Sequence, residues 1–435
     1  MKNSTVRSII FIWLGWLLLV IGFQALASAR ITPQWPDRAQ AWTTSETAKY
    51  EGNYQHDRAY LMEPFMNNQV AWDSEYYLGI AVGGYDDPLV PALGATGWMI
   101  PNFVTHIPTV GYQNEILSLS YAFLPFYPLT IRLLAMPLGL LGMNPIATAT
   151  LAGVLVSALG TLAAMLSLYE LSRDRLGEDG GLRAAFYLII FPTGFFLAQV
   201  YTEGLFVGLA FTSLAMLKRR NWLAAALLAC AATLTRAVGI ALIIPMMITW
   251  ISTREWFDLD MEWSQIYHAG IPYKPLLRAL LAFSPLFVFL AWKFSYLGVA
   301  FDFVEANFFG RGYLDLGGSF YSWATALRSM LSFKVPNHSA YYFTEFFAMI
   351  VAIVAILKSR KNFPELAWFS IAVFLISWGS GPAQGIHRYV LAAPALFIQL
   401  ADWGKHPAFD RVWTIASLLL MGLLAALFAF DFWVA

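Results

Sequence analysis

The sequence has few charged residues: Asp, Glu, Lys and Arg make up 12% of its 435 residues, whereas hydrophobic residues make up 59%. A soluble domain of ordinary composition is about 25% charged and about 45–50% apolar. So little charge cannot cover the surfaces of the roughly two or three soluble domains that this length predicts. The 17 Trp, 20 Tyr and 34 Phe residues also exclude a disordered chain. We therefore predict an all-α integral membrane protein with many helices.

Three further absences exclude other classes of protein. The single cysteine, Cys230, excludes a disulfide framework and a cysteine-rich metal site. The six histidines include no His-x-x-x-His pair, and no glycine-rich nucleotide loop is present, so no metal and no nucleotide cofactor is expected. Basic and acidic residues are equal in number, 27 each, which leaves no basic excess for binding nucleic acid.

The apolar runs predict the membrane helices. The first run, residues 9–23, follows Lys2 and Arg7, and this basic flank predicts a cytoplasmic N-terminus with residue 30 outside. Its end, Ala25 to Ala29, resembles a signal-peptidase site, so a cleaved signal peptide is the alternative to the retained helix that we favour. The later runs are residues 146–170, 184–200, 204–217, 222–236, 238–251, 278–299, 340–357, 364–379, 388–403 and 411–430.

Residues 117–142 are apolar enough to span a bilayer but contain three prolines and Arg132. If this segment spans, the short basic loops that follow it fall outside. If it lies in the outer interface or is re-entrant, those loops become cytoplasmic, as the positive-inside rule requires. We therefore predict a single membrane domain over residues 1–435, with about eleven transmembrane helices. Its outer loops are residues 30–142, including juxtamembrane segments, and residues 300–339.

The first outer loop contains a cluster of chemically interesting residues around Asp73. Aromatic and apolar side chains at helical spacing predict a short interfacial helix over residues 70–82. Asp73, next to Trp72, would lie near the membrane surface. Its carboxylate either accepts a proton from a substrate hydroxyl or caps the helix. The local sequence leaves both interpretations open.

Several ionisable residues fall near the predicted outer surface, at breaks between apolar runs. Glu203 and Arg236 each lie between two short runs, and Arg388 follows a bend made by Gly379-Ser380-Gly381-Pro382. Guanidinium groups bind phosphate through parallel hydrogen bonds, so these arginines suit the phosphate of a lipid carrier. The structural alternatives are a hydrogen bond to a neighbouring helix for Glu203 and capping or interface anchoring for Arg236 and Arg388. For Arg132 the alternative is an anchor at the interface.

Five motifs, taken in order, resemble the PIG-V family, the GPI mannosyltransferase II-like membrane enzymes. They are Trp72-Asp73 with Tyr76-Tyr77, Phe123 to Pro128, Phe191-Pro192-Thr193, Tyr201 to Phe206, and Leu234-Thr235-Arg236. The resemblance covers residues 70 to 255 and continues weakly to Arg388-Tyr389. The sequence departs from the family at Ala237, where proline is often found, and residues 83–115 show no family pattern.

The resemblance implies a GT-C glycosyltransferase fold and inverting transfer of a sugar from a polyprenyl- or dolichyl-phosphate carrier. The sugar would be mannose, and the acceptor would be a hydroxyl of a glycan, a glycolipid or a protein-linked acceptor. Asp73 would be the general base. The residues implied to bind or orient the acceptor are Trp72, Glu75, Tyr76, Tyr77, Asp86 with Asp87, and Glu203. The residues implied to hold the donor phosphate are Arg388, Arg236, Arg132 and Tyr389. A monophosphate leaving group held by arginines does not require a divalent metal.

Two other functions stay open. A transporter or flippase of lipid-linked saccharides would also bind phosphate, but its charges should line a path through the membrane, whereas these cluster on one side. An anchored scaffold would not need ionisable residues at membrane depth. We expect the protein in a bacterial plasma membrane, or in the ER membrane of a eukaryote, with its site on the extracytoplasmic or luminal face. The identity of the sugar, the acceptor and the organism stay open.

Overall fold

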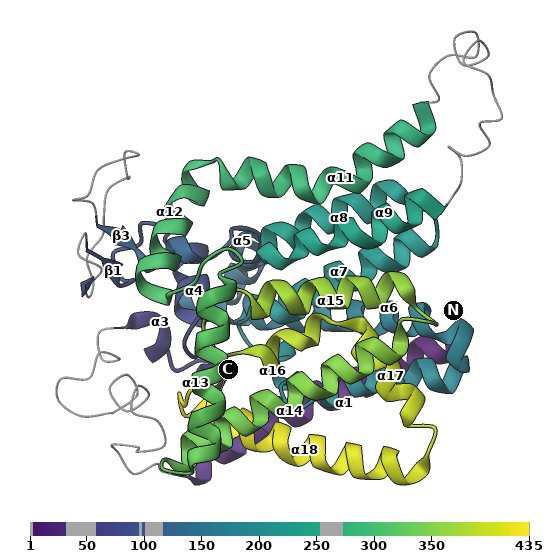
Figure 1. Ribbon diagram of the computed structural model, residues 1–435. Helices are drawn as coiled ribbons and strands as arrows, with labels where there is room; N and C mark the ends of the chain where they lie inside the picture. Colours follow the sequence, from purple (N-terminus) through teal and green to yellow (C-terminus); the bar gives the residue numbers. More distant parts are fainter. Residues whose placement is uncertain (1–2, 32–57, 95–97, 101–115, 253–272, 435) are drawn as a thin grey trace.

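The structure is a computed structural model that describes residues 3–31, 58–94, 98–100, 116–252 and 273–434. Its long helices run side by side in one bundle, and α3, α4, α12 and the strands gather at one end, at the left of Figure 1. The helices are α1 (Asn3–Arg30), α3 (Ala59–Met62), α4 (Ser74–Val82), α5 (Phe126–Leu138), α6 (Pro145–Ile190), α7 (Thr202–Lys218), α8 (Trp222–Thr235), α9 (Ile243–Ser252), α11 (Tyr273–Lys293), α12 (Tyr296–Val304), α13 (Leu316–Ser332), α14 (Pro336–Ser359), α15 (Pro364–Trp378), α16 (Ile386–Tyr389), α17 (Pro394–Trp403) and α18 (Pro407–Ala429).

Shorter elements connect these helices. The short 3-10 segments are η2 (Asn67–Gln69), η3 (Leu119–Ala122), η4 (Gly139–Leu141), η5 (Gly194–Ala198), η6 (Ala237–Leu242) and η8 (Val390–Ala392), and η7 (Glu305–Phe309) is a π-turn. The strands β1 (Ala92–Leu93), β2 (Met99–Ile100) and β3 (Leu117–Ser118) form a small antiparallel sheet in the order β2-β1-β3. In its register Ala92 pairs with Ile100 on one side and with Ser118 on the other. The sequence did not predict these strands.

The prediction of a helical membrane protein is confirmed. Within the described residues, α1, α6, α11, α14 and α18 are long and apolar enough to cross a membrane, and several shorter helices are also apolar. The protein is therefore a multi-pass membrane protein, although the number of about eleven spans stays a prediction. The predicted helix over residues 70–82 is present as α4. Helix α5 has only 13 residues, or about 20 Å, which is short of a bilayer core.

Prolines and one glycine set helix ends that hydrophobicity did not predict. The run predicted over residues 184–200 ends at Ile190, because Pro192 disfavours helix in the residue before it. Helix α6 instead extends back to Pro145 and is broken at Gly177, whose φ of 76° lies in the left-handed region. The run predicted over residues 388–403 is divided between α16, η8 and α17, because Pro394 can begin a helix but cannot continue one.

Glycines bring α6 and α7 into close contact. Gly204 and Gly208 on α7 face Gly160 on α6, and a Cβ atom on any of them would collide with backbone atoms of the facing helix. Small residues four positions apart let membrane helices approach to backbone contact, where dispersion is strongest. This contact fixes the N-terminal end of α7, where Glu203 lies in the first turn.

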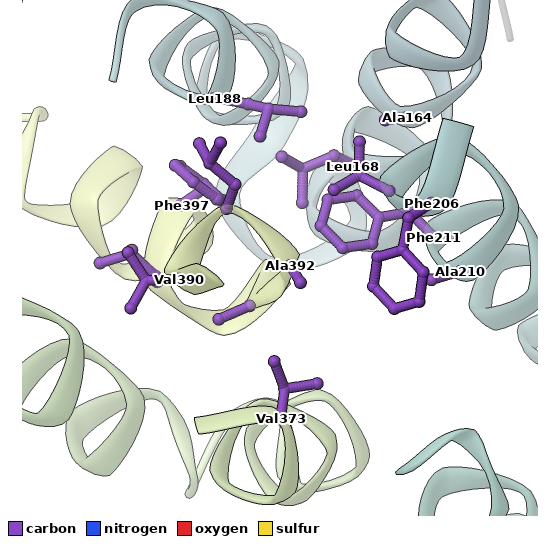
Figure 2. Packing of buried hydrophobic residues seen from close by; sticks show 14 of the residues in the cluster. Ala164, Leu168, Leu188, Phe206, Ala210, Phe211, Val373, Val390, Ala392 and Phe397 are labelled. Carbon is purple, nitrogen blue, oxygen red and sulfur yellow. The ribbon is translucent and has the colours of Figure 1, made fainter. Parts of the chain in front are cut away.

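The core surrounds α17, whose residues from Pro394 to Ala401 are all buried. Figure 2 shows Phe397 of α17 near Leu188 of α6, with Phe206 and Phe211 of α7 on the opposite side. A membrane helix buried on every face must be enclosed by other helices, and α6, α14 and α15 all pack against α17. The chain that leads into α17 contains Arg388, so this core holds the backbone of a candidate site residue.

Helix α1 is attached to the bundle by a cluster of buried glutamines. Gln24 is fully buried, and its amide donates to the carbonyl of Ala425 in α18 at 3.2 Å and to the side chain of Gln199 at 3.3 Å. Gln69 donates to Gln24 at 3.1 Å. Buried amides are costly unless they are paired, so these bonds specify how α1, η2 and α18 fit together.

Candidate functional site

A cavity of about 670 Å³ lies at the end of the bundle where the short elements gather. Its volume falls in the range of small-molecule sites. The wall is made by the starts of α4 and α7, η3, the junction of α8 and η6, α11, α12 with η7, the end of α15, and α16. Apart from the membrane helices α11 and α15, these are segments that the sequence predicted to share one face. The ionisable side chains of the described wall, tyrosines aside, are Asp73, Glu203, Arg236, Asp302, Glu305, Arg311 and Arg388.

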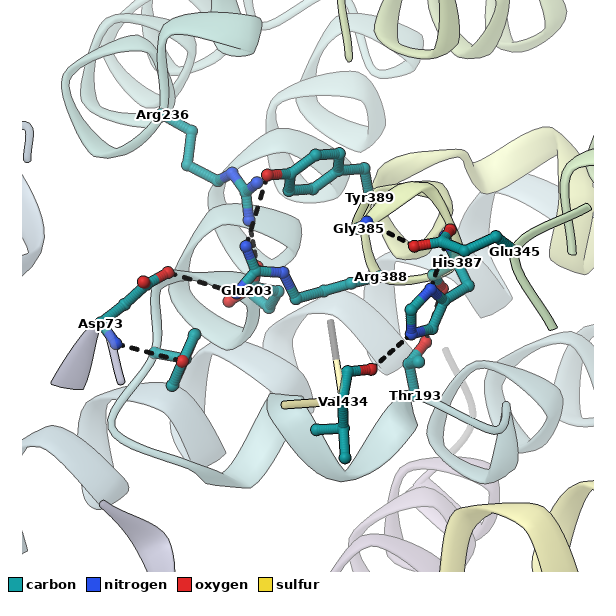
Figure 3. Close-up of polar contacts among 11 residues, drawn as sticks. Asp73, Thr193, Glu203, Arg236, Glu345, Gly385, His387, Arg388, Tyr389 and Val434 are labelled. Carbon is teal, nitrogen blue, oxygen red and sulfur yellow. Dashed lines mark hydrogen bonds and ion pairs between the residues drawn. The ribbon is translucent and has the colours of Figure 1, made fainter. Parts of the chain in front are cut away.

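Asp73 occupies the N-cap position of α4, but its side chain makes no capping hydrogen bond. Its Oδ2 atom instead lies 3.3 Å from Nη1 of Arg388 (Figure 3). Its backbone N–H donates to the hydroxyl of Tyr201 at 3.3 Å. The capping interpretation is therefore wrong. The carboxylate is available to the cavity, and its role as a general base stays a prediction.

Trp72, directly before Asp73, has an unusual backbone conformation. Its φ of 52° lies in the left-handed region, which is a true outlier for a bulky side chain and costs about 1–3 kcal/mol. Its indole N–H donates to the carbonyl of Phe432 at 3.3 Å, and its ring packs edge-on against Trp433 at 4.9 Å. Such strain persists only where the surrounding contacts enforce it. The backbone conformation of Trp72 affects the position of the Asp73 side chain, because Asp73 is the next residue.

Glu203 links two arginines that are distant in the sequence. It forms an ion pair with Arg236, and its Oε1 atom also lies 3.4 Å from Nε of Arg388. Arg236 has extended dihedral angles at the break between α8 and η6, which directs it toward α7. With Asp73 the cluster has two carboxylates and two guanidinium groups, so its charges balance. A buried charge is stable only when it is paired in this way.

Tyr389 gathers three guanidinium groups around its ring. The Cζ atoms of Arg236, Arg388 and Arg311 lie 4.9, 5.1 and 5.8 Å from its centroid. The negative face of an aromatic ring attracts cations, which offsets part of the repulsion among these like charges. The hydroxyl also accepts a hydrogen bond from Nη2 of Arg388 at 3.4 Å. The three guanidinium groups are therefore gathered on one part of the cavity wall, which also carries the carboxylates of Asp73, Glu203 and Glu305.

Sequence reasoning missed Glu305 and Arg311, which face the same cavity. Arg311 follows the π-turn η7, between two glycines, in the predicted second outer loop. A lone arginine flanked by glycines in such a loop was a signal that could have indicated Arg311 as a site residue. Burial raises the pKa of the Glu305 carboxyl from 4.5 to about 7; Arg311 opposes this shift, while the negative charges of Asp73 and Asp302 add to it.

The cavity wall includes six of the residues predicted for the site: Asp73, Tyr77, Glu203, Arg236, Arg388 and Tyr389. It does not include Trp72, Glu75, Tyr76, Asp86 or Arg132. Glu75 is buried, and its Oε2 atom lies 3.6 Å from Nη1 of Arg58. Asp86 accepts a hydrogen bond from the hydroxyl of Tyr121 at 2.9 Å. The structure thus gives both carboxylates partners outside the cavity.

Tyr76 and Arg132 also contact other parts of the first outer loop. The ring of Tyr76 stacks on Phe123 with centroids 4.7 Å apart. Arg132 donates from Nε to the carbonyl of Ala81 at 2.7 Å and from Nη2 to the carbonyl of Ile80 at 3.1 Å. A cation on the last carbonyls of α4 stabilises that helix end. Arg132 is therefore placed as a cap of α4, away from the other arginines.

Behind Arg388 lies a polar cluster that the sequence did not predict. Glu345 of α14 is fully buried, and it accepts hydrogen bonds from the backbone N–H of His387 and the hydroxyl of Tyr341 at 2.9 and 2.8 Å. Nδ1 of His387 lies 2.9 Å from Oε2 of Glu345, and Nε2 lies 2.6 Å from the carbonyl oxygen of Val434. No group of three His, Cys, Asp or Glu residues in the described part of the chain is arranged to hold a metal ion.

The bundle and its cavity define a multi-pass membrane protein with a site that carries several charged side chains at one end. Residues 94–305 match the family model of the PIG-V mannosyltransferases. The match covers a little less than half of the chain, and over that region it confirms the resemblance to the PIG-V glycosyltransferases that the motifs indicated. Asp73 and Arg388 lie outside the matched residues, so their roles depend on the geometry of the site. No curated protein matches the chain.

Among solved structures, the chain is similar to the oligosaccharyltransferase of Archaeoglobus fulgidus, at 14% identity over 96% of this chain and 54% of that chain, with a TM-score of 0.41. It is also similar to ArnT from Cupriavidus metallidurans bound to undecaprenyl phosphate, at 15% identity over 83% and 72% of the two chains, with a TM-score of 0.44. The chain spans about half the length of the oligosaccharyltransferase. These likenesses are distant, and the family assignment comes from the sequence match.

Proposed function

We propose that the protein is an inverting GT-C glycosyltransferase that moves mannose from a polyprenyl- or dolichyl-phosphate carrier to a hydroxyl of a glycan or glycolipid acceptor. One observation carries the proposal: Asp73 and Arg388 meet at 3.3 Å on the wall of the cavity, in a chain with a PIG-V region. Transfer from a lipid phosphate needs a base for the incoming hydroxyl and a cation for the departing phosphate. This pair supplies both.

In the proposed reaction, the acceptor hydroxyl attacks the anomeric carbon from the face opposite the lipid phosphate. A new C–O bond forms while the bond between the anomeric carbon and the phosphate oxygen breaks, which inverts the anomeric centre. The hydroxyl proton passes to the carboxylate of Asp73. The lipid phosphate leaves as an anion held by the arginines, whose positive charge stabilises the negative charge that develops in the transition state.

Arg388 has a second role in this proposal, because it controls when Asp73 becomes available. Before the donor binds, Arg388 is shared between Asp73 and Glu203 at 3.3 and 3.4 Å. An arriving phosphate can offer two oxygens in a bidentate geometry, whereas Asp73 contacts Arg388 through Oδ2 alone. The phosphate would replace Asp73 on Arg388, and the freed carboxylate could then accept the proton of an acceptor hydroxyl.

Arg311 is the second candidate for phosphate contact. Its Cζ atom lies 5.8 Å from the ring centroid of Tyr389, and its buried Nε–H has no hydrogen-bond partner among the described residues. A buried donor without an acceptor is costly and is satisfied when an acceptor oxygen binds. The apolar part of the wall suits the carrier chain; it comes from η6, α11 and α15, which pack together around Val238, Ile240, Phe289 and Ile376.

The test of the proposed function is an assay with purified protein and radiolabelled polyprenyl-phosphate mannose, with extracted membranes as the source of acceptor. Asp73→Asn should reduce transfer by about 100-fold or more, the usual contribution of a general base. The matched control is Asp402→Asn, because Asp402 is also paired with a cation, Lys405, but lies at the end of α17 away from the cavity.

Three outcomes decide between the hypotheses. Transfer by the wild type and its loss in Asp73→Asn support the proposal. Unchanged transfer in Asp73→Asn would overturn the assignment of the base. If the wild type carries labelled lipid across a vesicle membrane but forms no new glycosidic bond, the protein is a flippase, the alternative that the sequence left open.

Arg388 gives a second prediction within the same assay. Arg388→Ala should raise the donor KM more than the acceptor KM, because the guanidinium contacts the phosphate and not the acceptor. Arg388→Lys keeps the positive charge but cannot bind the phosphate in a bidentate geometry. The donor KM of this variant should therefore lie between those of the wild type and Arg388→Ala. Equal increases in both KM values would indicate that Arg388 has only a structural role.

A further inference from the structure

The chain returns to the site after its last helix. Helix α18 ends at Ala429, and Asp431 turns the backbone with a φ of 62°. The next three residues, Phe432–Val434, are called the clamp segment here. Val434 is 4% exposed and belongs to the main hydrophobic core. The clamp segment is therefore packed against the rest of the protein through Val434.

The clamp segment accepts hydrogen bonds from two residues that are far apart in the sequence. The carbonyl of Phe432 accepts from the indole N–H of Trp72 at 3.3 Å. The carbonyl of Val434 lies 2.6 Å from Nε2 of His387, and because a carbonyl only accepts, Nε2 is the donor (Figure 3). Trp433, between these two, packs edge-on against the ring of Trp72.

Each of these two residues directly precedes a member of the central ion pair. Trp72 is followed by Asp73, and His387 is followed by Arg388. The backbone around both is also constrained: Trp72 has the strained φ of 52°, and the carbonyl of His387 accepts a hydrogen bond from Thr193 at 2.7 Å. A small movement of either residue would move the charged side chain that follows it.

We propose that the clamp segment positions Asp73 and Arg388 relative to each other, by holding Trp72 and His387 in one rigid unit. This inference rests on the proposed function, because it assigns the two charged residues to the reaction. Groups that act on the two sides of a reacting centre must be held within a fraction of an ångström, and a misplacement of 1 Å can cost about 100-fold in rate. Trp72 and His387 are positioning residues, and neither belongs to the cavity wall.

The contacts can be removed one at a time. Trp72→Phe removes the indole donor but keeps an aromatic ring against Trp433. His387→Asn places an amide where Nδ1 lies, so it can still reach Glu345 but no longer reaches Val434. His387→Gln is the reciprocal variant, because its longer side chain reaches the position of Nε2. The matched control for Trp72 is Trp413→Phe, since the indole N–H of Trp413 has no acceptor in the described part of the chain.

We expect Trp72→Phe to lower kcat about tenfold, the equivalent of one lost hydrogen bond, with a donor KM within twofold of the wild type. His387→Asn should raise the donor KM, because it displaces Arg388, and His387→Gln should raise it less. The double variant Trp72→Phe with His387→Asn should be less impaired than the product of the two single effects, because both act through one segment. Replacing residues 432–434 by Gly-Ser-Gly should reproduce the double variant.

A second measurement separates this proposal from the proposed function. Hydrogen exchange of the backbone amides of residues 72–75 and 385–389 should become faster when the clamp segment is replaced, whether or not sugar transfer is detected. If the wild type transfers no sugar, the proposed function fails but the exchange result still tests the clamp. Unchanged exchange in both segments, or fully multiplicative kinetic effects of the two single variants, would overturn the proposal. Kinetic losses that match the loss of folded protein would overturn it as well.

Discussion

At the scale of single residues, Glu203 is the centre of the charge cluster. It has only 3% of its side chain exposed, yet it pairs with arginines from two different parts of the chain. The sequence predicted Glu203, Arg236 and Arg388 as candidates because ionisable residues at membrane depth are costly and thus usually functional. It could not predict that one carboxylate serves both arginines, because this depends on how η6 and η8, which directly follows α16, pack against α7.

Glu305 gives a prediction of pH dependence. Its pKa is raised from 4.5 to about 7 by burial, so the carboxyl is mostly neutral at pH 6 and mostly ionised at pH 8. An ionised Glu305 competes with the donor phosphate for Arg311, so the donor KM of the wild type should increase as pH rises through about 7. In Glu305→Gln the donor KM should stay flat over this range.

The same residue affects stability with a defined sign. A carboxyl whose pKa is raised on folding costs stability when it ionises, so the wild type should lose stability as pH rises from about 4.5 to 7. Glu305→Gln should lack this contribution. Melting curves in detergent at pH 5.5 and 8, compared for the two proteins, measure it. An identical pH dependence in both would contradict the assignment.

At the scale of elements, the contact of α6 with α7 is the clearest case of sequence specifying structure. Gly204 and Gly208 share one face of α7, four residues apart, opposite Gly160. Gly208→Leu should destabilise the protein by about 1–3 kcal/mol, because the new side chain would overlap backbone atoms of α6. It should also lower transfer, because Glu203 moves with the end of α7.

The matched control is Gly22→Leu in α1, where a Cβ atom would meet nothing within 4 Å among the described residues. Thermal unfolding of both variants in the same detergent gives the comparison. Similar melting temperatures for Gly208→Leu and the wild type would show that the two helices do not approach as closely as described.

Helix ends were the weakest part of the prediction from sequence at this scale. The apolar run over residues 184–200 looked continuous, but Pro192 ends α6 before it and η5 follows. The run over residues 388–403 was likewise divided at Pro394. Hydrophobicity reports which residues avoid water, whereas prolines and local hydrogen bonds decide where a helix begins and ends. The existence of the apolar helices was therefore predicted better than their limits, whereas α13 lies within the predicted second outer loop and was not predicted as a helix.

At the scale of the whole molecule, charge distribution grouped the site segments correctly. The positive-inside rule collected the first outer loop, Glu203, Arg236, the second outer loop and Arg388 on one face, and residues of all five line the cavity. The clamp segment, Glu345 and Arg311 were missed. Their place depends on tertiary contacts between distant parts of the chain, and periodicity in one sequence does not encode such contacts.

The side of the membrane that the site faces is a prediction that the chain is well suited to test. Because Cys230 is the only cysteine, a Cys230→Ser background allows single cysteines to be placed at Asn307, near the cavity, and at Lys405, in a predicted cytoplasmic loop. A membrane-impermeant thiol reagent added to intact cells should label the first and not the second. Labelling of the second alone would reverse the predicted orientation.

The bond between Gln24 and Ala425 has a consequence for how the protein is made. The two residues are 401 positions apart, and at about 5–20 residues per second roughly 20–80 s separate their synthesis. During that interval the amide of Gln24 lacks its partner on α18. Helix α18 also leads into the clamp segment, so the insertion of α18 supplies both the partner of Gln24 and the contacts of Trp72 and His387. A nascent chain is therefore expected to stay inactive until α18 is inserted.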